Sequence, residues 1–280
     1  MKYIIELEEL QKMMQKGEEF RLIDCRFYLG SPEKGREEYQ KGHIPGSIYL
    51  DLEKDLSSPV REHGGRHPLP HMEGFKSTLE KAGIDPDMKV VIYDGGDGAF
   101  AGRCWWLLKY AGHKEAFILN GGYQLWLDED LPIDKEIPSY EPRNYELHIK
   151  NDMLAGCEEV KEVSEGKKNA ILIDSRSYSR YIGKEEPIDK IAGHIPGAVN
   201  KDWSEGFEDG KWKTIEDQIE RFSEFQKEDP LIVYCGSGVT ATPNVLSLLE
   251  AGYKNVKLYA GSYSDWVSYP ENPVENISKK

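Results

Sequence analysis

Short apolar runs alternate along this chain with longer segments whose apolar residues recur every three to four positions. The run Leu-Ile-Val-Tyr at 231–234 is rich in β-branched residues and predicts a buried strand, and residues 242–250 predict a helix that ends before Gly252. Alternation of this kind is typical of a parallel sheet with helices on both faces, where ligands bind at the carboxyl ends of the strands. The pattern therefore predicts an α/β fold.

The whole pattern occurs twice, with a period of about 140 to 150 residues, which is far longer than a solenoid unit. Leu-Ile-Asp-Cys-Arg at 22–26 returns as Leu-Ile-Asp-Ser-Arg at 172–176, and Gly-His-Ile-Pro-Gly stands at both 42–46 and 193–197. Gly-x-Tyr-x-x-Trp at 121–126 likewise returns at 261–266. We expect two copies of one domain, at residues 1–130 and 151–280, joined by a charged, proline-rich linker at 131–150.

Composition narrows the class of protein. The 280 residues are 39% hydrophobic and 31% charged, as in an ordinary globular chain, and the net charge of −14 argues against nucleic acid and anionic membranes as partners. No apolar run approaches the ~18 residues of a membrane span, and the acidic start is unlike a secretory signal, so we expect a cytoplasmic protein. Four scattered cysteines fit neither a zinc site nor a disulfide framework. No metal is expected, and Cys25, Cys104 and Cys157 are expected to be buried fillers.

Cys235 is the exception among the cysteines. It follows the predicted strand at 231–234 and opens the loop Cys-Gly-Ser-Gly-Val-Thr-Ala, which leads into the predicted helix. Two glycines allow backbone N–H groups to turn toward the sulfur, and the start of the helix adds partial positive charge. Both effects favour an anion, so the loop predicts a thiolate nucleophile at neutral pH.

The repeat serves as an internal control, because a residue present in both halves serves the shared fold. His43 and His194 occupy the same motif and are interpreted as turn histidines bonded to the backbone, and Arg26 and Arg176 are matched in the same way. Cys235 is instead matched by Asp94. We therefore expect one active site per chain, in the second half, and a first half that is not catalytic.

These motifs resemble the tandem-domain rhodanese family of sulfurtransferases. The resemblance rests on Tyr-x-x-x-His-Ile-Pro-Gly at 39–46, on Val-x-x-Tyr-Ala-Gly-Ser-Tyr-x-Asp-Trp at 256–266 and on the Cys235 loop, and it covers nearly the whole chain. It implies two rhodanese-like α/β domains, of which the second is active. It also implies a sulfane sulfur carried as a Cys235 persulfide, with no separate cofactor.

Within that family, the loop Cys-Gly-Ser-Gly-Val-Thr-Ala resembles the 3-mercaptopyruvate branch, since thiosulfate enzymes typically carry bulky basic residues at the positions of Gly236 and Ser237. The expected function is transfer of sulfur from 3-mercaptopyruvate to a thiol, such as that of thioredoxin, or to cyanide. Thiosulfate:cyanide sulfurtransfer is the alternative, and a sulfur carrier or binding module without fast turnover is a further one.

The resemblance also implies roles for individual residues. Ser237 is expected to supply a proton or hydrogen bond to the leaving group, in a relay with Asp51 and His67 from the first half. His63 competes with His67 for that place.

Arg180 is expected to bind the donor's carboxylate, because it lies at the position of the family's clamping arginine and Gly30 takes its place in the first half. A second arginine usual before Gly-His-Ile-Pro-Gly is missing, so Lys190 is the cation expected there, and the choice of donor stays open. Loop residues complete the expected substrate site: Gly236, Gly238, Val239 and Thr240.

A cysteine phosphatase is disfavoured as a different class of enzyme. Its anion loop needs Cys-x5-Arg, whereas Ala241 stands at that position here. The Cys235 loop thus predicts sulfur rather than phosphate chemistry.

Overall fold

The computed structural model describes residues 1–278, which form two compact units. The first unit comprises Met1–Ser58, Pro70–Lys150 and Asp209–Trp212. The second comprises Pro59–Leu69, Asn151–Glu208 and the chain from Lys213 onward. Each half of the sequence thus lends a short segment to the unit built from the other half.

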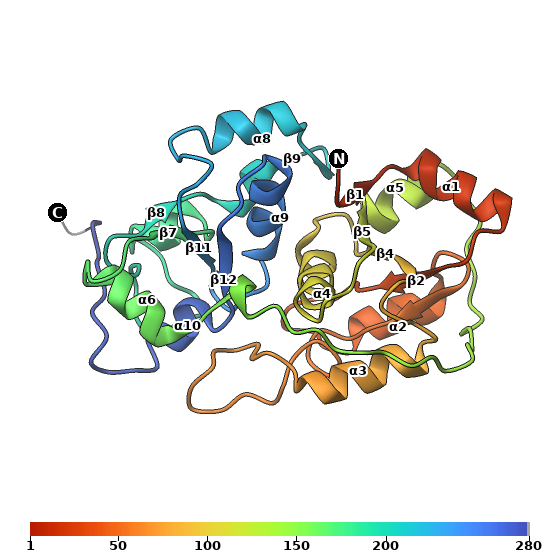
Figure 1. Cartoon of the computed structure of the whole chain (residues 1–280), viewed down its shortest axis with the longest axis horizontal. Helices are drawn as coiled ribbons and strands as arrows, with labels where there is room; N and C mark the ends of the chain where they lie inside the picture. Colours follow the sequence, from red (N-terminus) through yellow and green to blue (C-terminus); the bar gives the residue numbers. More distant parts are fainter. Residues whose placement is uncertain (279–280) are drawn as a thin grey trace. The chain divides into compact units, whose positions relative to one another are not determined.

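The first unit alternates strands and helices along the chain (Figure 1). The strands are β1 (Ile4–Ile5), β2 (Phe20–Asp24), β3 (Ser47–Tyr49), β4 (Lys89–Tyr93) and β5 (Ala116–Leu119). The helices are α1 (Leu7–Lys16), α2 (Lys34–Lys41), α3 (Met72–Lys81), α4 (Ala99–Tyr110) and α5 (Gly122–Asp128). The unit also includes the short strand β10 (Lys211–Trp212).

The second unit repeats this order of elements. Its strands are β6 (Leu154–Ala155), β7 (Ile171–Asp174), β8 (Val199–Asn200), β9 (Phe207–Glu208), β11 (Leu231–Tyr234) and β12 (Val256–Tyr259). Its helices are α6 (Cys157–Ser164), α7 (Tyr178–Tyr181), α8 (Ile215–Arg221), α9 (Thr242–Glu250) and α10 (Ser262–Trp266), with 3-10 turns η1 (Asn151–Met153) and η2 (Trp203–Gly206).

The two five-stranded sheets have the same topology. Their strand orders are β1-β5-β4-β2-β3 and β6-β12-β11-β7-β8, and every pairing within them is parallel. The middle strands, β4 and β11, precede the loops that hold Asp94 and Cys235. The predicted α/β fold with two matching parallel sheets is therefore confirmed.

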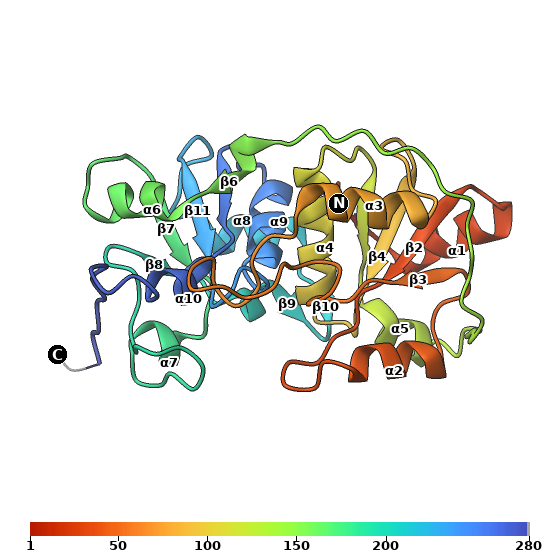
Figure 2. The same cartoon turned by 90° about the horizontal axis from the view of Figure 1, so that it is seen from below.

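Helices cover both faces of each sheet (Figure 2). In the first unit, Leu10 of α1 and Trp126 of α5 pack with Val91 and Tyr93 of β4 in one buried cluster. Side chains alternate along a strand, so Val90 and Ile92 face the opposite side, where α4 contacts β4 and β5. In the second unit, α6 and α10 contribute to the equivalent cluster, and α9 contacts β11 and β12.

Residues that the repeat assigned to the fold make the same contacts in both units. Arg26 binds the Asp24 carboxylate and the Gly42 carbonyl, just as Arg176 binds the Asp174 carboxylate and the Gly193 carbonyl. His43 Nδ1 lies 2.8 Å from the Tyr39 carbonyl oxygen, and His194 Nδ1 lies 2.7 Å from that of Tyr181. The interpretation of these histidines as turn residues bonded to the backbone is confirmed.

Residues 131–150 contain no helix or strand and belong to the first unit by their contacts. Asp134 forms an antiparallel bridge with His43, Tyr140 donates from its hydroxyl to the Gly46 carbonyl, and His148 donates from its N–H to the Ala111 carbonyl. The segment thus runs along the first unit and is bonded to it over most of its length.

Candidate active site

Cys235 lies at the carboxyl end of β11, the middle strand of the second sheet. Its N–H donates to Ser262 Oγ (3.1 Å), and its carbonyl accepts from the Tyr263 N–H (3.0 Å). The Ser264 N–H donates to the Gly236 carbonyl in the same way (3.0 Å). The start of α10 therefore fixes the backbone that carries the cysteine.

Gly238 directs an N–H group at the sulfur. The distance from Gly238 N to Cys235 Sγ is 3.2 Å, which is a normal length for a hydrogen bond to sulfur. The φ of Gly238 is +74°, and a Cβ here would collide with the Ala260 carbonyl, so only glycine fits. The Gly238 N–H is therefore held within hydrogen-bond reach of the cysteine sulfur.

Ser262 is a site residue that sequence reasoning missed. Its φ of +57° is unfavourable for a residue other than glycine, and its hydroxyl donates to the Tyr259 carbonyl (2.8 Å) while lying 4.0 Å from Cys235 Sγ. The matching residue of the first unit is Gly122, with a φ of +56°. The sequence held a signal for this residue, because serine stands at position 262 where the first copy of the repeat has glycine. Strained residues other than glycine cluster at functional sites.

Cys235 is only 1% exposed, yet its surroundings differ from those of the other cysteines. Burial raises the pKa of the Cys25 thiol well above its usual value, and Cys104, Asp24 and Asp94 raise it further. Cys25 and Cys104 are buried, as expected of fillers. Cys157 at the start of α6 is partly exposed, so the expectation that it is buried was wrong.

His67 contacts the loop and His63 does not. His67 Nδ1 lies 2.8 Å from Ser237 Oγ, and both side chains are buried. His63 instead is exposed, lies 2.8 Å from Ser268 Oγ and stacks on Tyr269. The structure thus brings together Ser237 and His67, two of the residues expected to form the relay.

Asp51 lies in the first unit, just after β3. Its Oδ1 accepts from the N–H groups of Glu53 (2.9 Å) and Lys54 (3.1 Å), which closes a turn. Its Oδ2 is buried and has no hydrogen-bond partner within the described chain. Buried carboxylate oxygens normally have a hydrogen-bond partner. The role of Asp51 in a relay stays a prediction.

Two arginines lie against Gly236. A Cβ built on Gly236 would lie 2.6 Å from Arg66 Nη2 and 3.5 Å from both terminal nitrogens of Arg180. Arg180 was expected here. Arg66 was missed, although it directly precedes His67 in the sequence, and that position was the available signal. Arg66 thus places a second arginine beside the cysteine loop, from a segment that lies far from Gly-His-Ile-Pro-Gly at 193–197 in the sequence.

Both arginines are held by carboxylates. Asp189 contacts Arg66 Nη1 through one oxygen and Arg180 Nη2 through the other (2.9 Å). Glu186 binds Arg180 (2.8 Å) and Arg176 (3.0 Å). Burial raises the pKa of Glu186, but hydrogen bonds from Arg180 and from nearby backbone N–H groups outweigh it, so the net shift is downward.

A cavity of about 250 Å³ adjoins this pair. Three cationic residues line it, namely Arg61, Arg66 and Lys190, together with Glu62 and Asp189. Lys190 is exposed and lines this cavity. Arg180 instead lies beside the cysteine loop. Anions have a local site here despite the acidic chain as a whole.

The remaining loop residues turn the chain into α9. Val239 is buried, and its carbonyl accepts from the N–H and the hydroxyl of Thr242 (3.0 and 2.7 Å). Thr240 is partly exposed. Contact of Gly236, Val239 and Thr240 with substrate stays a prediction.

The matching loop of the first unit shows what this turn can hold. The buried Asp94 carboxylate accepts from four backbone N–H groups: Gly96 (2.9 Å), Gly98 (3.1 Å), Phe100 (3.1 Å) and Ala101 (3.0 Å). Gly98 has a φ of +71°, close to that of Gly238. The loop after β4 therefore holds the buried Asp94 carboxylate with backbone N–H groups, whereas one N–H group, that of Gly238, is seen to donate to Cys235 Sγ among the described residues.

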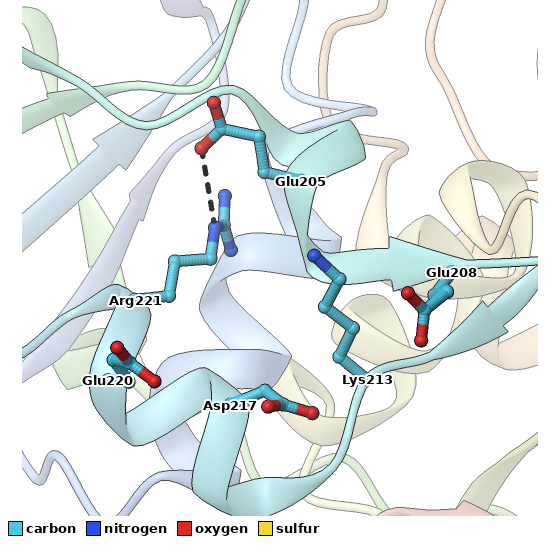
Figure 3. Close-up of a pocket in the computed structure, with 6 residues that line it drawn as sticks. All are labelled: Glu205, Glu208, Lys213, Asp217, Glu220 and Arg221. Carbon is cyan, nitrogen blue, oxygen red and sulfur yellow. Dashed lines mark ion pairs between the residues drawn. The ribbon is translucent and has the colours of Figure 1, made fainter.

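A larger cavity of about 420 Å³ lies elsewhere in the second unit (Figure 3). It is lined by four carboxylates, from Glu205, Glu208, Asp217 and Glu220, and by two cations, from Lys213 and Arg221. Four negative charges against two positive ones would repel an anionic donor, so its size does not make it the donor site.

Metal and membrane sites were also sought in the part of the chain that the structure describes. Residues 1–278 contain no group of three or more His, Cys, Asp or Glu side chains placed to hold a metal ion. Among the same residues, no helix combines the length and the apolar character that crossing a membrane requires.

Comparison with known proteins places the chain in a family. The rhodanese-like domain matches residues 6–129 and 157–269. A probable 3-mercaptopyruvate sulfurtransferase from Pseudomonas aeruginosa is 39% identical over 259 residues, covering 90% of this chain and 91% of that protein. A putative thiosulfate sulfurtransferase, SseB, from Mycobacterium tuberculosis is 34% identical over 275 residues, covering 97% and 96%.

Solved structures agree with these relatives. The crystal structure of SseA from Escherichia coli, a 3-mercaptopyruvate sulfotransferase by its description, superposes with a TM-score of 0.81 at 30% identity, covering 94% of this chain and 100% of that one. The chain belongs to the rhodanese family and carries two rhodanese domains in tandem. The resemblance found in the sequence is confirmed.

Proposed function

We propose that this protein is a sulfurtransferase that moves a sulfane sulfur from 3-mercaptopyruvate, through a Cys235 persulfide, to a thiol or cyanide. The observation that carries the proposal is the pairing of Cys235 Sγ with the Gly238 N–H, beside two arginines at Gly236. A nucleophilic sulfur and a carboxylate-binding pair thus adjoin one short loop.

The first step is attack by the Cys235 thiolate on the donor's sulfur. A sulfur–sulfur bond forms, the donor's carbon–sulfur bond breaks, and the electron pair stays on the carbon side as pyruvate enolate. The Ser237 hydroxyl, hydrogen-bonded to His67, donates to that enolate, which becomes pyruvate once it gains a proton. Asp51 is the third member that we propose for this relay.

The second step returns the thiolate. Cyanide or an acceptor thiolate attacks the outer sulfur, the sulfur–sulfur bond breaks, and its electron pair returns to Cys235. The outer sulfur leaves as thiocyanate or as the acceptor's persulfide. We expect a dithiol protein of the thioredoxin type to serve as a cellular acceptor, in the cytoplasm.

Thiosulfate is the second candidate donor, because a relative that is 34% identical carries that name and the arginine pair accepts any small anion. The arginines that lie against Gly236 favour 3-mercaptopyruvate as the donor. The space that a bulky basic side chain would occupy at position 236 is taken by Arg66 and Arg180.

Intact mass spectrometry tests the proposal directly. Incubation with 3-mercaptopyruvate should add about 32 Da, one sulfur atom, per chain, and cyanide should remove it. Cys235→Ser should abolish the addition, whereas the matched control Cys157→Ser should not. Absence of added sulfur with both 3-mercaptopyruvate and thiosulfate would refute the assignment, and a larger kcat/KM for thiosulfate would reverse the choice of donor.

A further inference from the structure

A chain of five ion pairs runs through the second unit beside the cysteine loop. It links three arginines with three carboxylates: Arg66, Arg176, Arg180, Asp174, Glu186 and Asp189. The inner end, Arg176 with Asp174, repeats the Arg26 and Asp24 pair of the first unit and so belongs to the fold. The outer end, Arg66 and Arg180 with Asp189, has no match in the repeat, since Gly30 takes the place of Arg180.

Asp189 occupies the place that a carboxylate ligand would take between two guanidinium groups. One of its oxygens faces Arg66 and the other faces Arg180. The Asp189 side chain is 3% exposed, whereas those of Arg180 and Arg66 are 17% and 31% exposed. The carboxylate is thus enclosed, while the arginines keep open edges toward solvent, and those of Arg66 also line the cavity.

The charge of this outer group is what a donor would meet. The three guanidinium cations and the three carboxylates of the network balance, so it is neutral, and removing the Asp189 charge would leave it at +1. Burial raises the pKa of Asp189, and the neighbouring Arg66 opposes that rise. The negative charge of Asp189 beside the two arginines repels a dianion about twice as strongly as it repels a monoanion.

We propose that Asp189 determines the choice between sulfur donors: by neutralising one guanidinium of the Arg66 and Arg180 pair, it suits the site to a monoanionic carboxylate and disfavours a compact dianion such as thiosulfate. The inference rests on the proposed function and deepens it. Asp189 acts through the arginines and is therefore a positioning and selectivity residue, not a catalytic one.

Asp189→Asn raises the charge of the network from 0 to +1. A dianion responds to an added charge about twice as strongly, in free energy, as a monoanion does. If kcat/KM for 3-mercaptopyruvate rises by a given factor, that for thiosulfate should rise by about the square of that factor. We expect the ratio of kcat/KM for thiosulfate to kcat/KM for 3-mercaptopyruvate to rise by roughly fivefold, because the interaction with one partly screened charge changes binding by about this factor.

Two other variants separate charge from position. Glu185→Gln removes the same charge from an exposed residue of the same segment, and it should leave the ratio near its original value. Asp189→Glu keeps the charge and should also leave the ratio unchanged. If Asp189→Asn fails to fold by its thermal unfolding curve, Asp189→Ser, whose hydroxyl still hydrogen-bonds an arginine, replaces it in the same comparison.

The experiment measures kcat/KM for both donors, with cyanide as acceptor, at low and at high salt. A shift toward thiosulfate that shrinks with salt and is absent in Glu185→Gln supports the proposal. An unchanged ratio, a shift toward 3-mercaptopyruvate, or an equal shift in Glu185→Gln overturns it. If the unaltered protein accepts sulfur from neither donor, the proposed function fails instead, so the two failures are distinguishable.

Discussion

At the scale of single residues, the site is built from exceptions to the repeat. Cys235, Ser262 and Arg180 stand where the first half has Asp94, Gly122 and Gly30. Each exchange replaces a residue that serves only the fold with one that can bind or attack. The difference between two copies of a domain therefore locates chemistry even within one sequence.

Ser262 offers a test of this principle, because its left-handed backbone is unfavourable for serine. Ser262→Gly should relieve that strain and raise the free energy of unfolding by about 1 kcal/mol, whereas Ser262→Ala should not. Both variants remove the hydroxyl that accepts from the Cys235 N–H, so both should form the persulfide more slowly, by roughly tenfold.

Chemical denaturation and rapid-mixing measurements of sulfur uptake would check both parts for Ser262. Ser264→Ala, two residues further along α10, is the control for a nearby lost hydroxyl, and it removes the acceptor of the Arg66 N–H instead. A change in the free energy of unfolding with no change in the rate of sulfur uptake would assign Ser262 to the fold alone.

At the scale of elements, a buried histidine ties three parts of the first unit together. His113, just after α4, places Nε2 at 2.8 Å from the Met88 carbonyl and Nδ1 at 3.2 Å from the Tyr145 hydroxyl of the 131–150 segment. Burial lowers the pKa of His113 to about 4. The folded protein thus favours the neutral ring.

This pKa predicts acid sensitivity. The unfolded chain binds a proton at the ordinary pKa of about 6.5, so the stability that neutral His113 provides is complete above that pH and is lost as the pH falls toward 4. At pH 5 the loss should be about 2 kcal/mol relative to pH 7.5. His113→Gln, whose amide can still donate to Met88, should lack this part of the pH dependence.

Denaturant unfolding of both proteins at the two pH values measures this contribution, because other titrating groups cancel in the comparison. An equal pH dependence in the protein with His113 and in His113→Gln would contradict the prediction. His148→Gln serves as a control, since that histidine is exposed.

The element scale also shows where sequence patterns suffice. The strands and helices around Cys235 were predicted from apolar runs and from the glycines that follow them, because local periodicity determines buried strands in a parallel sheet. Arg66 could not be placed this way. Arg66 belongs to a segment without periodicity. Its backbone N–H donates to the Ser264 hydroxyl, which is 198 residues away in the sequence.

At the scale of the whole molecule, the loops after the two middle strands hold different groups. In the first, the Asp94 carboxylate satisfies four buried N–H groups permanently. In the second, the Gly238 N–H donates to the sulfur of Cys235, on which we propose the persulfide forms. The family, the fold and the sulfurtransferase class were predicted correctly from the repeat and are confirmed, whereas the roles of the site residues remain predictions.

Asp94→Ala tests the contrast. Removing the carboxylate leaves buried N–H groups without acceptors and should destabilise the protein by about 3 kcal/mol or more, while adding no second sulfur-binding site. Asp97→Ala, on the same loop, should have a smaller effect because Asp97 bonds one N–H group, that of Ala99.

Thermal unfolding, together with the count of sulfur atoms per chain by mass spectrometry, checks both expectations for Asp94. If Asp94→Ala leaves the thermal unfolding curve unchanged, water must replace the carboxylate as the acceptor of these N–H groups. Two sulfur atoms per chain would mean that the first domain keeps a latent site.

The exchange of segments between the two units has a consequence for the order in which the protein is made. Residues 59–69 leave the ribosome with the first half, but their partners come far later, since the Gly64 N–H bonds to the Asp265 carboxylate across 201 residues. Closing so long a loop is slow relative to forming local contacts. Because the partners of Arg66 and His67 are made last, we expect sulfur transfer to be the last capability that the nascent chain acquires.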